Sequence, residues 1–169
     1  GETFASQLCV TDTDVSMEGY HQEASLHAVG LFDLEGKNVL YANRILEPLY
    51  PASTTKIMTA YVALKYGNME DIVTVSAHAT DFAEDEQVCG LQTGDQLSMK
   101  DLINGLLLYS GNDCAVAIAE HVSGSVDAFV QKMNEEARIL GATRTHFTNP
   151  HGLQNKDHYT TAYDLYLMF

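Results

Sequence analysis

The sequence predicts a mixed α/β (α+β) domain, with strands near its beginning and helices in its second half. Hydrophobic residues make up 46% of the 169 residues and charged residues 19%, a mixture typical of a globular protein with a core. Residues 26–32 and 39–42 read as the two strands of a hairpin, whereas apolar residues recur at helical spacing in the second half, as Phe129, Met133 and Ala137 do. Strands near the beginning and helices in the second half together indicate a mixed fold class.

The first half contains an arm, a hairpin, a helix and a short strand. Residues 1–25 are polar without a clear period, and we expect an N-terminal arm there, followed by one domain over residues 26–169. The other predicted elements are two hairpin strands at 26–32 and 39–42, a helix at 54–66 that ends before Gly67, and a strand at 72–75.

The sequence of the second half predicts four helices, several of them marked by local start or stop signals. Ser98 with Asp101 is similar to a capping box, and Thr161 with Asp164 repeats this spacing before the last helix. Gly141 ends the third of these helices. The apolar run 106–109 predicts buried helix and is far shorter than the roughly 20 residues of a membrane-spanning helix. The predicted helices begin near residues 98, 113, 125 and 161.

The formal net charge of −14 excludes nucleic acid as an expected partner, because such a field repels phosphate. A small anionic ligand would need a local lysine or arginine. Four acidic side chains lie in residues 80–90, and we interpret this charge run as a solvated face.

The three cysteines, Cys9, Cys89 and Cys114, show no C-x-x-C spacing, so neither a disulfide framework nor a zinc site is expected. A single disulfide bridge is an alternative that the cysteine spacing leaves open. Cys114 opens an apolar helical stretch, where a buried inert thiol is favoured over a nucleophile. The seven histidines have no metal-binding spacing, and we expect no metal.

The first catalytic motif is the S-x-x-K sequence from Ser53 to Lys56 at the start of a predicted helix. Residues three apart share a helical face, so the hydroxyl and the amine can meet. A serine needs an adjacent base, and burial with the positive end of the helix dipole would favour a neutral lysine. The alternative is an ordinary helix N-terminus with an exposed lysine.

The second motif, Ser110-Gly111-Asn112, lies between two predicted helices. Ser110 could relay a proton between Lys56 and a leaving nitrogen, and the Asn112 amide could hold a substrate carbonyl and brace Lys56. The alternative is a simple turn in which Asn112 caps the following helix.

Together these motifs resemble the serine D-alanyl-D-alanine carboxypeptidases, low-molecular-mass penicillin-binding proteins of the peptidase S11 family. The S-G-N form of the middle motif is similar to theirs. The flanking sequences agree in the segments 51–60, 110–113, 119–121, 145–153 and 160–165.

This resemblance implies a β-lactamase/transpeptidase-like fold, with a helical subdomain on an antiparallel sheet. Ser53 would be the nucleophile, Lys56 and Ser110 would be catalytic, and Asn112 would bind substrate. The implied substrate is a peptidoglycan stem peptide ending in D-Ala-D-Ala, and β-lactam antibiotics would acylate the same serine. No cofactor is implied. The family works outside the cytoplasmic membrane, so the start at Gly1 suggests an exported protein whose signal is missing.

The family's third motif, K-T-G, does not occur in the sequence. We therefore expect a partial penicillin-binding catalytic domain whose C-terminal sheet strands are absent, and an isolated chain that is inactive. The missing C-terminal segment or another copy would complete the sheet. The alternatives are a β-lactamase or esterase on the same fold, and a non-catalytic peptidoglycan-binding remnant.

Overall fold

The computed structural model describes residues 11–169, which form two compact units. One unit contains residues 11–50, 137–146 and 159–169, and the other contains residues 51–136 and 147–158. The chain combines helices with short antiparallel strands, as the sequence predicts. Residues 1–10 of the predicted arm, with Cys9, lie outside the described residues.

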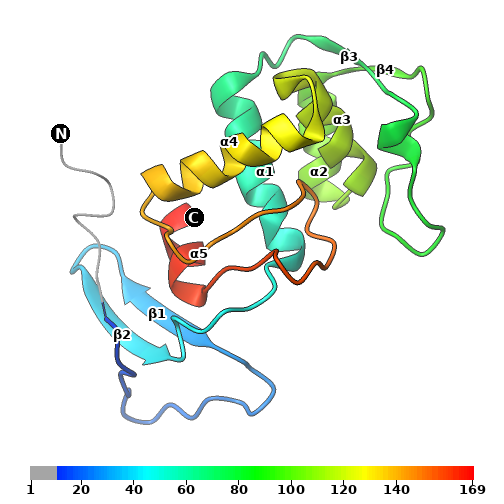
Figure 1. The fold of residues 1–169 in the computed structure, drawn as a ribbon. Coiled ribbons are helices and arrows are strands. Elements are labelled where there is room, and N and C mark those ends of the chain that lie inside the picture. The colour runs from blue at the N-terminus through cyan, green and yellow to red at the C-terminus, as the bar shows by residue number, and fades with distance from the viewer. Residues whose placement is uncertain (1–10) are drawn as a thin grey trace. The chain divides into compact units, whose positions relative to one another are not determined.

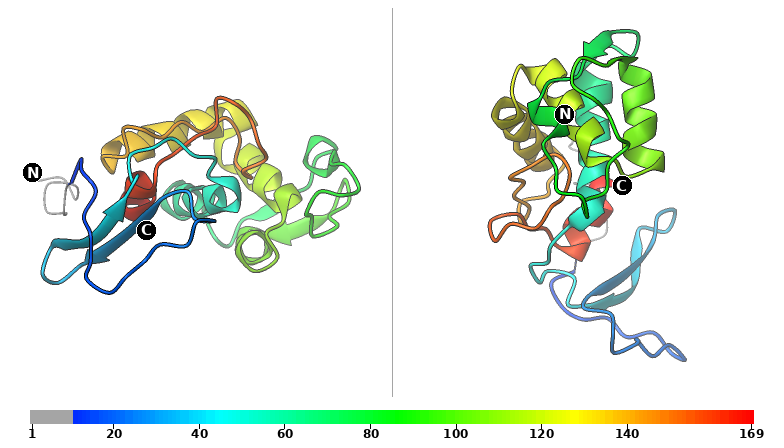
Figure 2. Two further views of the ribbon diagram at one scale, coloured as in Figure 1. Left: turned by 90° about the horizontal axis from the view of Figure 1, so that it is seen from below. Right: turned by 90° about the vertical axis from the view of Figure 1, so that its right-hand side faces the viewer.

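The first unit is built around the predicted hairpin, which both views of Figure 2 show as two adjacent arrows. Strand β1 (Val29–Asp33) pairs antiparallel with β2 (Asn38–Asn43). The Asp33 side chain closes the turn, because its Oδ1 accepts the backbone N–H groups of Glu35 and Gly36. In the predicted arm, Val15 exchanges two backbone hydrogen bonds with Ala42 of β2, at 2.8 and 2.9 Å.

The short helix α5 (Ala162–Met168) completes this unit. Its predicted start is confirmed, because the Thr161 hydroxyl accepts the N–H of Asp164 at 3.0 Å. The Tyr166 ring stacks on Phe32 of β1 with centroids 3.9 Å apart. Local capping and this aromatic contact together fix the helix beside the hairpin.

The second unit is a helical assembly around α3 (Asn112–Ser123), whose first eight residues are all buried. Helices α1 (Thr55–Tyr66) and α2 (Met99–Leu108) both contact α3 and each other (Figure 1). The Ser98 hydroxyl accepts the N–H of Asp101 at 3.1 Å, which confirms the predicted start of α2. The site described below lies where α1 and α3 begin.

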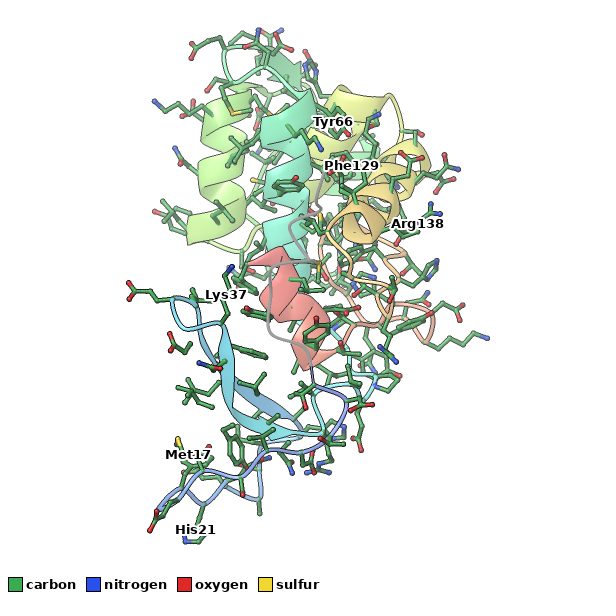
Figure 3. The ribbon with its side chains drawn as sticks, turned by 90° about the vertical axis from the view of Figure 1, so that its left-hand side faces the viewer. Met17, His21, Lys37, Tyr66, Phe129 and Arg138 are labelled. Atoms are coloured by element: carbon green, nitrogen blue, oxygen red, sulfur yellow. The ribbon has the colours of Figure 1, made fainter. Side chains whose placement is uncertain are left out.

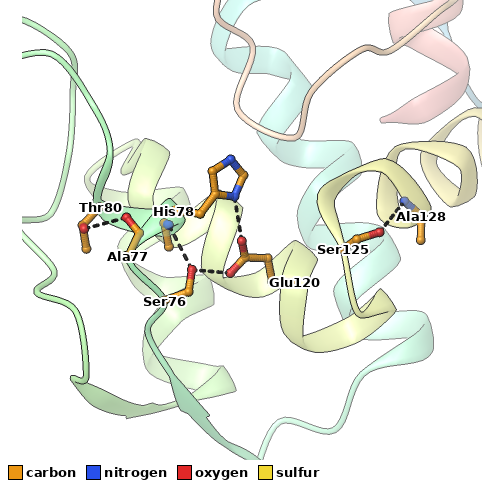
Figure 4. A network of polar contacts seen from close by, with 8 residues as sticks. Ser76, Ala77, His78, Thr80, Glu120, Ser125 and Ala128 are labelled. Atoms are coloured by element: carbon orange, nitrogen blue, oxygen red, sulfur yellow. Dashed lines mark hydrogen bonds and ion pairs between the residues drawn. The ribbon is translucent and has the colours of Figure 1, made fainter.

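Helix α4 (Val126–Ile139) begins at the predicted Ser125, whose hydroxyl accepts the N–H of Ala128 (Figure 4). Phe129 and Met133 on one face are fully buried, as their spacing of four residues predicts. Figure 3 labels Phe129 on α4 and Tyr66 at the end of α1. Gly141 follows α4 with a φ of 85°, a conformation that suits glycine after a helix.

A second antiparallel ribbon joins β3 (Ile72–Thr74) to β4 (Gln96–Ser98). The sequence predicts β3 but not β4. Between them lies a single 3₁₀ turn, η3 (His78–Thr80), and the mostly irregular acidic segment that the sequence predicts as a loop.

The prediction of buried helix for residues 106–109 is wrong for three of the four residues. Leu106 is buried, but Leu107, Leu108 and Tyr109 are 51%, 76% and 68% exposed. Helix α2 buries Leu102 and Leu106, and a rotation of 100° per residue turns the next side chains outward. Within residues 11–169, no helix has the length and apolar character needed to cross a membrane.

Candidate active site

Ser53 lies at the centre of a short 3₁₀ turn, η2 (Ala52–Thr54), that leads directly into α1. Its side chain is exposed, whereas Thr55 and Lys56 after it are buried. Ala52 has a φ of 47°, a left-handed conformation that is strained for a residue with a Cβ atom. Ser53 is therefore exposed on a constrained turn at the N-terminal end of α1.

Lys56 is only 4% exposed, and burial lowers the pKa of its amine. A lowered pKa is the direction that the S-x-x-K motif predicts for a general base. The Lys56 Nζ donates a hydrogen bond to the carbonyl oxygen of His151 at 2.7 Å. Within residues 11–169 no hydrogen bond joins Lys56 Nζ to Ser53 Oγ.

Ser110 is the residue that directly contacts Ser53. It lies between α2 and α3 with a φ of 54°, and its Oγ donates to Ser53 Oγ at 3.2 Å. The two serines are 57 positions apart in the chain. The structure therefore brings together the S-x-x-K and S-G-N motifs of the sequence.

Asn112 is the first residue of α3 and is 3% exposed. The alternative in which Asn112 caps this helix is wrong, because the capping position is Gly111 and no side chain caps the helix. The backbone N–H of Asn112 instead donates to the Gln87 carbonyl at 2.9 Å. The Asn112 side chain lines the same pocket as Ser53.

The 149–153 loop supplies three further residues that line this pocket, His151, Gly152 and Leu153, to which the two sequence motifs assign no role. Asn149 Oδ1 accepts the N–H groups of His151 and Gly152, which shapes a tight turn. His151 Nδ1 accepts the N–H of Leu153 at 3.1 Å. Burial, reinforced by the charges of Lys56 and His158, lowers the pKa of His151 to about 4, so its imidazole is neutral near pH 7.

The pocket has a volume of about 460 Å³. Its lining combines the buried amine of Lys56 with two carboxylates, Asp85 and Glu86, from the acidic segment. An exposed hydroxyl, a buried amine and a buried amide thus converge in one cavity, which suits acyl transfer to serine. The lining residues are Ala52, Ser53, Lys56, Asp85, Glu86, Gln87, Asn112, His151, Gly152, Leu153 and Gln154.

A second serine and histidine, Ser76 and His78, meet at Glu120 (Figure 4). Ser76 Oγ donates to Glu120 Oε2 at 2.6 Å, and His78 Nδ1 lies 2.7 Å from Glu120 Oε1. The carboxylate stands between the two groups, so His78 cannot take the serine proton as a catalytic base would. This cluster ties η3 to α3.

Cys114 is buried, and burial, together with the neighbouring Cys89 and Asp113, raises the pKa of its thiol. A raised pKa suppresses the thiolate, which is the reactive form. Cys114 is therefore a poor nucleophile toward molecules outside the protein, in line with the buried thiol that the sequence predicts.

Comparison with known proteins places the chain in a family. Residues 14–169 match the Peptidase_S11 family, described as D-alanyl-D-alanine carboxypeptidase. The chain belongs to this family, and the resemblance found in the sequence is confirmed.

Among its relatives is the D-alanyl-D-alanine carboxypeptidase DacF of Bacillus subtilis. The two are 41% identical over 143 residues, which cover 82% of this chain and 36% of the relative. The chain therefore spans little more than a third of the length of that relative.

Two solved structures share the fold. The D-alanyl-D-alanine carboxypeptidase of Mycobacterium tuberculosis has a TM-score of 0.82 at 34% identity, covering 92% of this chain and 60% of that one. A variant of the DD-transpeptidase of Streptomyces K15 has a TM-score of 0.77 at 32% identity, covering 86% and 61%. These likenesses confirm the predicted transpeptidase-like fold class.

Proposed function

We propose that the protein containing this chain is a serine-type D-Ala-D-Ala carboxypeptidase that removes the terminal D-alanine from peptidoglycan stem peptides. The observation that supports this most directly is the 3.2 Å contact between Ser110 Oγ and Ser53 Oγ, in a pocket also lined by Lys56. The names of the relatives support the same substrate.

In this proposal Ser53 Oγ attacks the carbonyl carbon of the penultimate residue. The Ser53 proton passes to neutral Lys56, whose lowered pKa makes that form accessible. Ser110, which is hydrogen-bonded to Ser53, gives its hydroxyl proton to the leaving nitrogen and takes up the proton held by Lys56, so D-alanine departs as an amine and Lys56 is neutral again. Water then hydrolyses the ester on Ser53 and restores the hydroxyl.

Asn112 has a positioning role in the proposal. Its buried side chain lines the pocket, where the amide can donate to a peptide carbonyl of the substrate. The fixed backbone bond from Asn112 to Gln87 holds this end of α3 in place. The Ser53 N–H at the start of the helix is proposed as one donor to the developing oxyanion.

The proposed setting is the cell envelope outside the cytoplasmic membrane, where peptidoglycan lies. A penicillin presents a strained amide to the same serine, and we propose that it acylates Ser53. This property supplies the test, because an acylated serine can be located by mass spectrometry.

We predict that the full-length protein loses penicillin acylation on Ser53→Ala and nearly all of it on Lys56→Ala. The first change removes the nucleophile and the second removes its base. Mass spectrometry of the intact protein and its peptides measures the penicilloyl adduct. Ser16→Ala and Lys100→Ala are the controls, since both residues are exposed and lie outside the pocket.

A penicilloyl adduct on the Ser53→Ala protein would overturn the assignment. Rapid turnover of a chromogenic cephalosporin without D-alanine release from stem peptides would indicate a β-lactamase or esterase. Binding to peptidoglycan without any acylation would indicate a non-catalytic binding protein.

A further inference from the structure

Outside the pocket, the thiols of Cys89 and Cys114 converge. Their Sγ atoms and a carboxylate oxygen of Asp113 all lie within 4.8 Å of one another. Cys89 is exposed in the acidic segment, whereas Cys114 is 2% exposed in the first turn of α3. The two positions are distant in sequence, so the fold has brought them together.

Two glycines leave the space that the sulfur atoms share. A Cβ atom at Gly111 would lie 2.5 Å from Cys89 Sγ and 3.3 Å from Cys114 Sγ. A Cβ atom at Gly105 would lie 2.8 Å from Cys114 Sγ and 3.1 Å from Cys89 Sγ. Each of the two points lies close to both sulfur atoms, so both thiols face one small volume, and Asp113 Oδ1 lies 2.9 Å from the point at Gly111.

The Asp113 side chain holds the backbone of the two cysteines close together. Its Oδ1 accepts the N–H groups of Cys89 and Cys114, and its Oδ2 accepts the N–H of Leu91, all at 2.9 Å. Both oxygens are therefore engaged with backbone, which makes Asp113 a clamp rather than a free metal ligand. With only two thiols left, the cluster suits a disulfide better than a metal ion.

We propose that Cys89 and Cys114 form a redox-active pair whose disulfide fastens the segment around Cys89 to the start of α3. A rotation of the side chains must bring the sulfur atoms to the bonding distance of about 2.0 Å. The bond would close a covalent loop beside Gln87, which binds Asn112 and lines the pocket. The proposal does not depend on the carboxypeptidase activity.

The difference in exposure sets the order of events. The Cys89 thiolate attacks a small-molecule disulfide, forms a mixed disulfide and releases one small thiol. Cys114, held next to the mixed disulfide, then attacks Cys89 Sγ and expels the second small thiolate, which takes up the Cys114 proton. Two protein thiols are oxidised to one disulfide, and the small disulfide is reduced to two thiols.

The test uses the full-length protein with Cys9→Ser, incubated with glutathione disulfide and then digested with trypsin without reductant. Lys65, Lys100 and Lys132 place Cys89 and Cys114 in different peptides, 66–100 and 101–132. We expect these peptides as one cross-linked species that is lighter than their sum by two hydrogen atoms. Reductant should separate them.

Two further measurements distinguish a cysteine pair that the fold positions for a disulfide from non-specific oxidation of the thiols. In the reduced protein, iodoacetamide should modify Cys89 at least about 10-fold faster than Cys114, because only Cys89 is exposed. After oxidation, the amides of Cys89 and Leu91 should exchange with deuterium more slowly than in the oxidant-treated Cys89→Ser and Cys114→Ser controls. A stable glutathione adduct on Cys89, links between molecules, or thiols that persist would each overturn the proposal.

Discussion

At the scale of single residues, two residues next to the proposed nucleophile have strained backbone conformations. Ala52 and Ser110 both have positive φ angles, and one precedes Ser53 while the other bonds to it. Such a conformation costs on the order of 1–3 kcal/mol for a residue with a side chain, so neighbouring structure must impose it. Gly152 is one such neighbour, because a Cβ atom there would lie 1.9 Å from the Ala52 carbonyl oxygen.

We predict that Gly152→Ala displaces the Ser53 turn and slows penicillin acylation roughly 10–100-fold, since a shift of about 1 Å can cost this much. The clash is with backbone, which cannot rotate away. Stopped-flow acylation and thermal melting measure the two effects. Gly94→Ala is the matched control, because Gly94 has nearly the same φ (91° against 93°) but an added Cβ atom there would have no neighbour within 4 Å.

Gly94→Ala should therefore lower the melting temperature slightly and leave acylation unchanged. Equal acylation rates in the two variants would mean that contact with Gly152 does not position Ser53.

His151 predicts a pH dependence of stability. Burial lowers the pKa of its imidazole from 6.5 to about 4, so the unfolded chain binds the proton more tightly. Stability then falls as the pH drops from about 6.5 toward 4, by at most about 1.4 kcal/mol per pH unit. Chemical denaturation across this window should show a shallower fall for His151→Gln. Identical slopes in the variant and the parent would contradict the shift.

Sequence motifs predict the pair Ser53 and Lys56 because residues three apart on a helix are local. The contact of Ser110 with Ser53 depends on how α1 and α3 pack, so the motifs suggest it only through the family resemblance. The bond from Lys56 to His151 could not be predicted, because its acceptor is a backbone carbonyl 95 positions away. A backbone acceptor leaves no signal in the side-chain types.

At the scale of helices, α1 and α4 are joined by a partly buried ion pair. Both oxygens of Glu136 on α4 accept from Lys65 Nζ of α1, at 2.9 and 2.8 Å, and Tyr66 also donates to this carboxylate. Burial alone would raise the pKa of Glu136, but the bonds from Lys65 and Tyr66 outweigh it and lower the pKa. The Glu136 side chain is 1% exposed, so it depends on these partners.

We predict that Lys65→Met lowers the melting temperature by roughly 5 °C, because it leaves a buried carboxylate without its cation. Lys132→Met is the control, since Lys132 lies over the Tyr66 ring at 4.6 Å and has no acid partner among residues 11–169, and we expect a much smaller change. The double variant Lys65→Met with Glu136→Met should recover part of the loss. Equal shifts for Lys65→Met and Lys132→Met would show that the ion pair contributes little.

Most elements were predictable because their signals are local. The Ser98 and Thr161 caps each accept a backbone N–H three residues ahead, and Gly141, predicted to end its helix, follows α4 with a positive φ. Strand β4 was not predictable because its three residues form a strand only by pairing with β3, more than 20 positions earlier. The burial of residues 107–109 was wrongly predicted because an apolar run does not indicate which helix face is buried.

At the scale of the whole chain, charge opposes the proposed ligands. The net charge is −14, and a penicillin or a stem peptide brings a further carboxylate. The pocket has the same excess of negative groups, because two carboxylates, Asp85 and Glu86, line it with a single lysine, Lys56. The K-T-G lysine of the family, which the sequence lacks, would supply an additional cation. Binding of an anion here should therefore depend on salt and on individual acidic residues.

We predict that Asp85→Asn in the full-length protein speeds penicillin acylation about twofold at low ionic strength. One unit charge at about 8–10 Å in a water-like dielectric contributes roughly 0.5 kcal/mol of repulsion. The gain should vanish near 1 M salt, where the Debye length is about 3 Å. Glu70→Gln removes the same charge from an exposed position outside the pocket and should change the rate much less. A gain that persists at high salt would mean that Asp85 acts through the shape of the loop, and equal gains in both variants would assign the effect to net charge alone.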